Sequence, residues 1–155
     1  MIRGKRVVVL LCCVFLLLLG GCGAKEVKLD VAATADKLAS EVAFKDQLSP
    51  LNDKAAFKLF GLDDSTVVGQ KVYAGTGATA EEIGVWECKD ENAAKTVQSA
   101  AEQRVKDQTQ AFANYVPGEL TKLKSPFIKT YGKYVVYVCC DDTTQVQKVI
   151  DSFTK

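Results

Sequence analysis

Histidine does not occur in the 155 residues of this chain. Because histidine is the commonest general base and the commonest metal ligand, its absence excludes Ser/His/Asp and Cys/His nucleophile arrangements. It also makes a zinc site hard to build. The remaining residues predict neither a metal site nor a cofactor, so we expect a protein that is not an enzyme.

Arginine is scarce as well, and Arg104 is the only arginine after residue 22. Residues 23–155 contain 17 basic residues (20 minus 3) and 19 acidic ones, so their net charge is about −2. Arginine clusters make the forked contacts by which many proteins bind phosphate groups. Their absence, together with scattered lysines, excludes nucleic acid as an expected partner.

One long hydrophobic run is present, the 13 residues 7–19, and it follows a segment with three positive charges and no acidic residue. This order is typical of a secretory signal peptide. A helix of that length spans roughly 20 Å, which is less than the ~30 Å hydrocarbon core of a membrane. We therefore expect a cleaved export signal, with an uncleaved membrane span as the alternative.

The hydrophobic run ends in Leu19, Gly20, Gly21 and Cys22, a junction that resembles the lipobox of bacterial lipoproteins. The resemblance implies that the cysteine is acylated and that the chain is then cleaved before it. Two or three acyl chains hold a protein firmly on a membrane. Lipid on Cys22 then places the protein at the extracytoplasmic face of the cell membrane; an ordinary signal peptide with a chance cysteine is the alternative.

The chain is thus expected to have three parts, which are a removed signal (1–22), a short polar tether (23–30) and a single folded domain (31–155). With 48% hydrophobic and 25% charged residues, the chain has the composition of a folded protein. A chain of this length is expected to form one domain of ordinary size.

Hydrophobic periodicity predicts eight elements in the folded domain. Apolar residues at spacings of three and four predict helices, whereas runs of β-branched and aromatic residues predict strands. In chain order we expect a helix at 31–42, a helix at 51–60, strands at 65–74 and 82–89, a helix at 94–115, strands at 126–130 and 134–140, and a helix at 142–153. The order ααββαββα predicts an α+β fold with helices packed on an antiparallel four-stranded sheet.

Cys88, Cys139 and Cys140 are the cysteines that follow the lipidation site. They end two predicted strands, which suggests a disulfide from Cys88 to one of the other two. Adjacent strand residues face opposite sides of a sheet, so only one of Cys139 and Cys140 can point towards Cys88. The alternatives are three small buried hydrophobic side chains, or a vicinal or intermolecular bridge.

Arg104 lies beside the apolar face of the longest predicted helix. A partly buried guanidinium needs a carboxylate or carbonyl partner, which predicts a buried ion pair; contact with a ligand carboxylate is the alternative. Four aromatic residues, Trp86, Phe112, Tyr115 and Tyr137, are predicted to belong to the core or its rim.

Three acidic pairs occur at residues 63–64, 81–82 and 141–142. Their spacing fits neither a calcium-binding loop nor a carboxylate dyad, so we expect solvated turns and helix caps. Residues 75–80 match the GxGxxA form of the dinucleotide fingerprint, but they lead into a strand where that fingerprint needs a helix. We interpret them as a hairpin turn.

Four segments carry a family resemblance, namely residues 60–62, residues 80–85, residues 104–117 with Gln108, Phe112 and Tyr115, and residues 132–136. Because of these segments, the chain that follows the predicted signal resembles DUF4358, a family of uncharacterised lipoproteins of Gram-positive bacteria. The resemblance implies one small α+β domain on a surface lipoprotein. It transfers no catalytic or binding residue.

The predicted anchor, the compact size and the lack of a recognisable combination of catalytic residues predict a non-catalytic binding or accessory module at the cell surface. Its expected partners are the membrane, through the lipid, and a surface protein, a wall component or a small ligand. One alternative is a small hydrolase-like enzyme that uses carboxylate, lysine and tyrosine groups in a cleft. A second is a thiol redox protein that uses Cys88 with Cys139 or Cys140.

Overall fold

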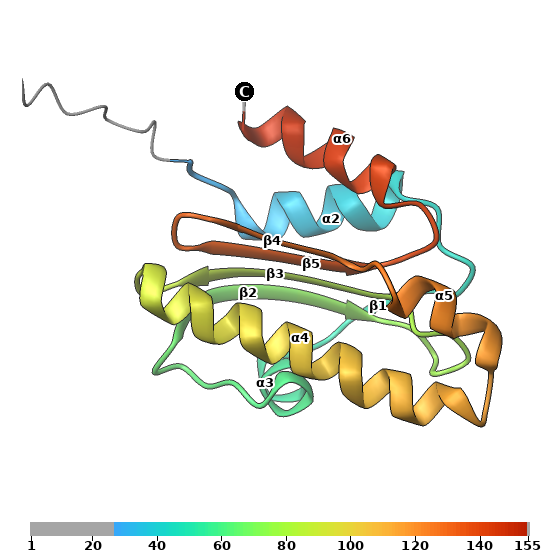
Figure 1. Ribbon diagram of the computed structural model, residues 1–155. Helices are drawn as coiled ribbons and strands as arrows, with labels where there is room; N and C mark the ends of the chain where they lie inside the picture. Colours follow the sequence, from blue (N-terminus) through green and yellow to red (C-terminus); the bar gives the residue numbers. More distant parts are fainter. Residues whose placement is uncertain (1–26, 155) are drawn as a thin grey trace, which may run out of the picture.

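A five-stranded antiparallel sheet separates two layers of helices (Figure 1). The computed structural model describes residues 27–154, so the predicted signal and the predicted lipidation site, Cys22, lie outside the described residues. The strand order across the sheet is β1-β2-β3-β5-β4. The strands are β1 (Ser49–Pro50), β2 (Val67–Ala74), β3 (Glu82–Cys88), β4 (Phe127–Tyr131) and β5 (Tyr134–Cys139).

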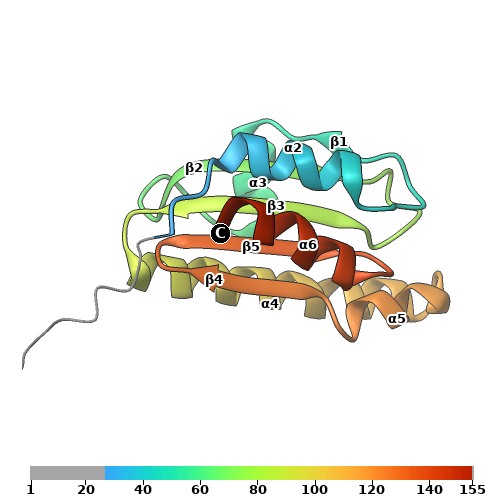
Figure 2. The ribbon, with the colours of Figure 1, turned by 90° about the horizontal axis from the view of Figure 1, so that it is seen from above.

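Helices cover both faces of this sheet (Figure 2). One face packs against α2 (Val31–Glu41) and α6 (Thr143–Thr154), and the other against α3 (Asp53–Phe60) and α4 (Glu91–Ala113). The short helices η1 (Pro117–Glu119) and α5 (Leu120–Leu123) follow α4. The domain therefore has two hydrophobic cores, one on each face of the sheet.

The central strands explain this two-sided packing. All residues of β5 are buried, and in β3 only Glu87 is not. Successive side chains of a strand point to opposite faces. Ile83 and Val85 therefore pack in the core beneath α2 and α6, whereas Trp86 and Cys88 pack in the core against α4.

The predicted α+β class and the antiparallel sheet are confirmed, but the sheet has five strands where the sequence predicted four. The extra strand, β1, pairs with Tyr73 and Ala74 of β2. It has two residues and includes Pro50, so it has no hydrophobic period that a sequence pattern can reveal.

The longest helix ends earlier than predicted. α4 ends at Ala113, and η1 and α5 occupy a segment that the sequence indicated as loop. The N–H of Tyr115 bonds the carbonyl of Phe112 at 3.2 Å, a spacing of three residues that marks the end of the helix. The apolar period continues to Tyr115, but that side chain is exposed, so the period overstates the length of the buried helix face.

Capping side chains fix where the helices begin. Asp90 caps α4 by accepting from the N–H three residues later at 2.8 Å. At the start of α6, Asp142 accepts from the N–H of Thr144 at 2.9 Å. Gln145 accepts from the N–H of Ala43 at 3.0 Å, and so joins α6 to the segment after α2.

The folded part reaches back beyond the predicted start at residue 31. Leu29 is buried in the core beneath α2 and α6. Within residues 27–154, none of the helices combines the length and the apolarity that crossing a membrane requires.

Candidate ligand-binding groove

A groove of about 700 Å³ opens between α3, α4 and the loop that joins β2 to β3. Sites for small ligands typically have volumes of roughly 300–1,000 Å³. The groove is lined by Leu51, Ala55, Leu59, Ala74, Gly75, Thr76, Gly77, Thr79, Glu81, Glu82, Arg104, Asp107, Gln108, Ala111, Phe112 and Tyr115. These residues come from segments far apart in the chain, so the groove exists only in the folded protein.

One wall of the groove is α4, which presents two rows of side chains. Residues four apart on a helix lie one above the other. The inner row is Arg104, Gln108 and Phe112, and the outer row is Asp107 and Ala111, continued by Tyr115 two residues beyond the end of α4. The inner row is mostly buried and the outer row is exposed, so α4 offers a largely buried lower wall and an open rim.

The opposite wall is apolar and is formed by Leu51, Ala55 and Leu59. Asn52 caps α3 by accepting from the N–H of Ala55 at 2.9 Å, which sets the start of this wall. At the other end Gly61 takes the left-handed conformation, with a φ of 64°, that glycine adopts without strain.

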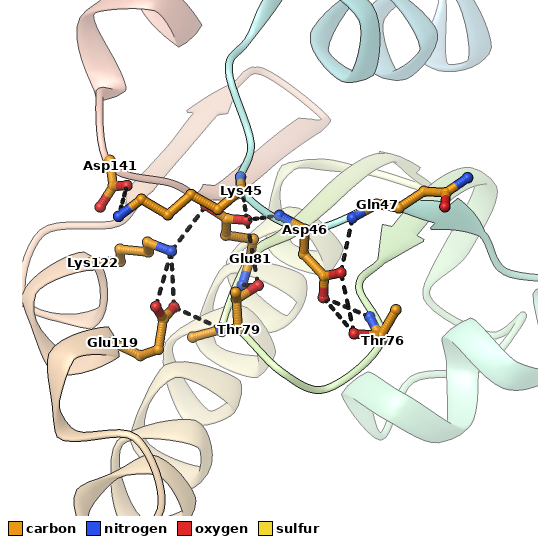
Figure 3. A network of polar contacts seen from close by, with 10 residues as sticks. Lys45, Asp46, Gln47, Thr76, Thr79, Glu81, Glu119, Lys122 and Asp141 are labelled. Atoms are coloured by element: carbon orange, nitrogen blue, oxygen red, sulfur yellow. Dashed lines mark hydrogen bonds and ion pairs between the residues drawn. The ribbon is translucent and has the colours of Figure 1, made fainter.

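The glycine-rich loop at residues 75–80 forms the rim between these walls and is tied down by Asp46 (Figure 3). Its Oδ2 accepts from the N–H of Thr76 at 2.7 Å. A Cβ on Gly75 would lie 2.4 Å from the same oxygen, so the contact requires glycine. Partial burial raises the pKa of Asp46, but the hydrogen bonds from Thr76 and Gln47 outweigh it and leave the pKa below its usual value.

Arg104 forms an ion pair with Glu82 at the floor of the groove. The guanidinium donates from Nη2 to Glu82 Oε1 at 2.6 Å and from Nε to Oε2 at 3.2 Å. The glutamate side chain is 5% exposed and the arginine side chain 24%, so the pair is largely removed from water but still borders the groove. The predicted ion pair of Arg104 is thus formed, and the same side chain lines the groove.

The polar floor continues to Tyr137, whose hydroxyl lies 3.4 Å from Glu82 Oε2 and 3.4 Å from Gln108 Oε1. Burial raises the pKa of Tyr137 well above its usual value, so the hydroxyl stays protonated. Burial also raises the pKa of Glu82, and the hydrogen bonds and charge of Arg104 offset only part of that effect. The carboxylate is engaged by the guanidinium and is not a free base.

A second set of charges, Glu81, Glu119 and Lys122, lies buried next to the loop and is called here the Lys122 cluster (Figure 3). The side chain of Lys122 is 1% exposed and that of Glu81 0%. The ammonium lies 2.9 Å from Glu81 Oε1 and 2.9 Å from Glu119 Oε2. Burial lowers the pKa of Lys122, but the bonds to Glu119 and Glu81 outweigh it and raise the pKa above its usual value.

The Lys122 cluster also accepts hydrogen bonds from the backbone of two parts of the chain. Glu81 Oε2 accepts from the N–H groups of Lys45 and Asp46 at 2.8 Å each. Glu119 Oε2 accepts from the N–H of Ala80 at 2.9 Å. The cluster thereby fixes the end of the loop against the segment before β1 and against α5.

The acidic pair at residues 81–82 was predicted to lie in a solvated turn, and this prediction is wrong. Glu81 is 1% exposed and Glu82 3%. Their cationic partners, Lys122 and Arg104, follow more than twenty residues later in the chain. No local pattern of the sequence identifies them as partners.

The three cysteines are free and buried, so the suggested disulfide from Cys88 to Cys139 or Cys140 is not formed. Strands β3 and β5 are antiparallel, and Cys139 pairs with Glu82, six residues before Cys88. At ~3.3 Å per residue this separates the thiols by ~20 Å, whereas a disulfide needs Cα atoms within ~7 Å. The expectation overlooked that the ends of neighbouring antiparallel strands lie at opposite ends of the sheet.

Residues 40–140 match the family model described as Domain of unknown function (DUF4358). The match covers 101 of the 155 residues. The chain belongs to the DUF4358 family. The comparisons found no match among curated proteins and none among solved structures.

The DUF4358 segment contains all five strands, every residue that lines the groove and the whole Lys122 cluster. It leaves out α6 and all but the last two residues of α2. The family match therefore centres on the sheet and on the face that carries the groove.

Proposed function

We propose that this DUF4358 protein is a non-catalytic binding module. Lipid on Cys22 anchors the module at the extracytoplasmic face of the cell membrane. The observation that carries the proposal is the groove, which combines a volume of about 700 Å³ with an apolar wall and a floor of paired charges. Concave, mainly apolar sites with a few placed polar groups are the usual form of ligand sites.

The state of the titratable groups supports binding over catalysis. In the described part of the groove, Glu82 is held by Arg104 and Glu81 by Lys122, so neither is a free general base. Burial raises the pKa of Cys88 and Cys140 to about 11 and that of Cys139 to about 12. Since the thiolate is the reactive form, these values argue against the thiol redox alternative.

The anchor is tested by expressing the full chain in a Gram-positive host and measuring the intact mass of the product and its share in the membrane fraction. A lipid-sized mass on a chain that begins at Cys22, absent from Cys22→Ala, supports the anchor. Cys13→Ala is the matched control, because that cysteine lies in the hydrophobic run and is expected to leave with the signal. A soluble product without lipid from the unaltered chain would overturn the anchor.

The groove is tested in the Cys22→Ala background, which removes the lipid as a competing site. Nile red, a neutral apolar dye, is expected to gain fluorescence on binding, and Ala111→Trp is expected to abolish most of the gain because the indole fills the groove. Ala113→Trp is the matched control, since Ala113 lies on α4 but does not line the groove. Equal dye binding by both variants would contradict the proposal.

A further inference from the structure

The carboxylates that line the groove differ in how far they are neutralised. Glu81 is paired with Lys122 and Glu82 with Arg104. Among the groove residues within 27–154, Asp107 alone carries a carboxylate without an ion pair. It is exposed and accepts one hydrogen bond from the amide of Gln103 at 2.8 Å. The unbalanced charge of the groove is therefore negative and lies on its outer rim.

The cations of the described chain offset this charge only in part, because the guanidinium of Arg104 is shared between Glu82 and Asp107. None of the lysines in residues 27–154 lines the groove, and the one arginine there is already bound to Glu82. An anionic ligand at the rim would be repelled by the charge of Asp107. A cationic ligand would instead be attracted, because opposite charges within a few ångströms favour each other even near the surface.

An exposed aromatic ring stands at the other end of the same row. Tyr115 is 71% exposed, and its ring centroid lies 6.3 Å from that of Phe112. Tyr115 lies two residues beyond the end of α4 at Ala113, and both it and Asp107 line the groove. The small side chain of Ala111 lies between the two and leaves the space open. A cation held by Asp107 can therefore extend along α4 towards aromatic faces, which attract cations.

We infer that the groove takes an organic ammonium ion carried on an apolar body. The ammonium group binds at Asp107, and the apolar body lies over Ala111 towards Tyr115 and against the wall formed by Leu51 and Leu59. This inference rests on the proposed function, since it requires that the groove binds a ligand. It adds the chemical class of that ligand.

Three probes with the same apolar body and different charge test the inference, namely n-hexylammonium, hexan-1-ol and hexanoate. Their affinities for the full chain carrying Cys22→Ala are measured by titration calorimetry. We expect hexylammonium to bind about five-fold more tightly than hexanol, as a partly exposed ion pair implies, and hexanoate more weakly than either. The preference for hexylammonium should shrink at 1 M salt, where charges are screened.

Variants of α4 locate the site. Asp107→Asn should remove the preference for hexylammonium over hexanol and leave the affinity for hexanol unchanged. Glu102→Gln is the matched control, because Glu102 is an exposed acidic residue of α4 that does not line the groove. Tyr115→Ala should weaken hexylammonium binding several-fold, whereas Tyr115→Phe should retain it because the ring remains. Unfolding curves of each variant verify that the fold is intact.

The ammonium group can belong to a free amine or to a lysine side chain, and a second pair of probes separates these sources. Acetyl-Leu-Lys-Leu-amide is compared with acetyl-Leu-Gln-Leu-amide. A lysine peptide that binds more tightly than both the glutamine peptide and hexylammonium indicates a peptide-borne cation. Tighter binding of hexylammonium indicates a free amine. Either result supports the shared chemistry.

The outcomes separate this inference from the function on which it rests. If hexanol or hexanoate binds as tightly as hexylammonium, and Ala111→Trp blocks all three, the groove binds ligands but the inferred charge class is wrong. If Asp107→Asn leaves the preference for the cation intact, the assigned position of the ammonium group is wrong. If neither these probes nor Nile red binds, the inference and the proposed function fail together.

Discussion

At the scale of a single residue, Lys122 shows how neighbouring groups offset the free-energy cost of burying a charge. A buried charge is costly unless it is paired and hydrogen-bonded, because burial removes its hydration. Here two carboxylates surround one ammonium, and three backbone N–H groups donate to those carboxylates. The arrangement leaves each charge compensated, but it depends on all three residues being present.

Lys122→Met is therefore expected to destabilise the fold, because Glu81 and Glu119 would face each other without their cation. Breaking a buried charge pair by removing one partner costs about 3–5 kcal/mol. Urea unfolding at pH 7 measures the loss. Lys124→Met serves as the control, since that lysine is exposed and two residues away. A loss below about 1 kcal/mol for Lys122→Met would show that the cluster contributes little.

The buried thiols predict a loss of stability at alkaline pH. Their pKa values, about 11 for Cys88 and about 12 for Cys139, exceed the usual value of 9.0. The stability linked to a raised pKa is present below the unfolded value and is lost as pH rises towards the folded one. At pH 10 each such thiol lowers the free energy of unfolding by about 1.4 kcal/mol.

Cys139→Ala tests this linkage through the difference between two pH values. The substitution should lower stability at pH 8 because it leaves space in the core, but the further loss between pH 8 and pH 10 should be smaller by about 1.4 kcal/mol. Urea unfolding under reducing conditions gives both numbers. An identical pH dependence in the two proteins would mean that Cys139 ionises as easily in the folded state as in the unfolded one.

At the scale of elements, β3 depends on a glycine that makes room for the tryptophan two residues later. A Cβ on Gly84 would lie 1.9 Å from the far end of the Trp86 ring. That ring cannot simply move away, because Trp86 is fully buried and packs edge-on against Phe60 at a centroid distance of 4.9 Å. The glycine is thus required by packing in the centre of the sheet.

Gly84→Ala should accordingly lower the free energy of unfolding by about 1–3 kcal/mol, the usual cost of overpacking a core. Gly69→Ala in the neighbouring strand β2 is the control, since a Cβ there meets no atom within 4 Å. Thermal or urea unfolding compares the two. Equal stability of both variants would show that the Trp86 ring relocates without cost.

At the scale of the whole molecule, one sheet supports two cores that do not touch each other. Trp86 reports on the core against α4, and it is the only tryptophan of the chain. Ile150 belongs to the other core, where α6 covers β3 and β5, and it is fully buried. Because β3 and β5 are buried on both faces, neither core can be lost without exposing strands that the other core needs.

Ile150→Ala should therefore shift the unfolding transition seen by Trp86 fluorescence, although the two residues lie on opposite faces. Removing most of a buried isoleucine side chain costs about 2–5 kcal/mol. Fluorescence and far-ultraviolet circular dichroism should give the same midpoint, as a single cooperative transition requires. A fluorescence midpoint that stays unchanged while the dichroism midpoint falls would mean that the two faces unfold separately.

Much of the element order was predictable, and the reason is visible in particular segments. The continuous apolar run of β5 marks a strand buried on both faces, and the capping residues Asp90 and Asn52 lie where helices begin. β1 was missed because it has two residues. η1 and α5 were missed because a proline and a glycine, Pro117 and Gly118, suggested a loop.

The candidate site was predictable only in fragments. The sequence singled out Arg104 beside the apolar face of the longest helix and Phe112 and Tyr115 as residues of the core or its rim, and the structure brings all three to the groove. It gave no signal for Glu82 as the partner of Arg104, nor for Lys122 as the cation that buries Glu81. The partners in those pairs lie far apart in the chain, and no periodic pattern of the sequence links them.

The sequence by itself determined the local features, which are the predicted export signal with Cys22, the elements with a clear hydrophobic period and the absence of histidine chemistry. Only the tertiary structure decided that the acidic pair at residues 81–82 is buried, that Cys88 and Cys139 lie at opposite ends of the sheet, and that a groove with one unpaired carboxylate opens beside α4. The reason is physical. Hydrophobic period and capping act between residues a few positions apart, whereas burial, ion pairing and concavity depend on which distant segments the sheet brings together.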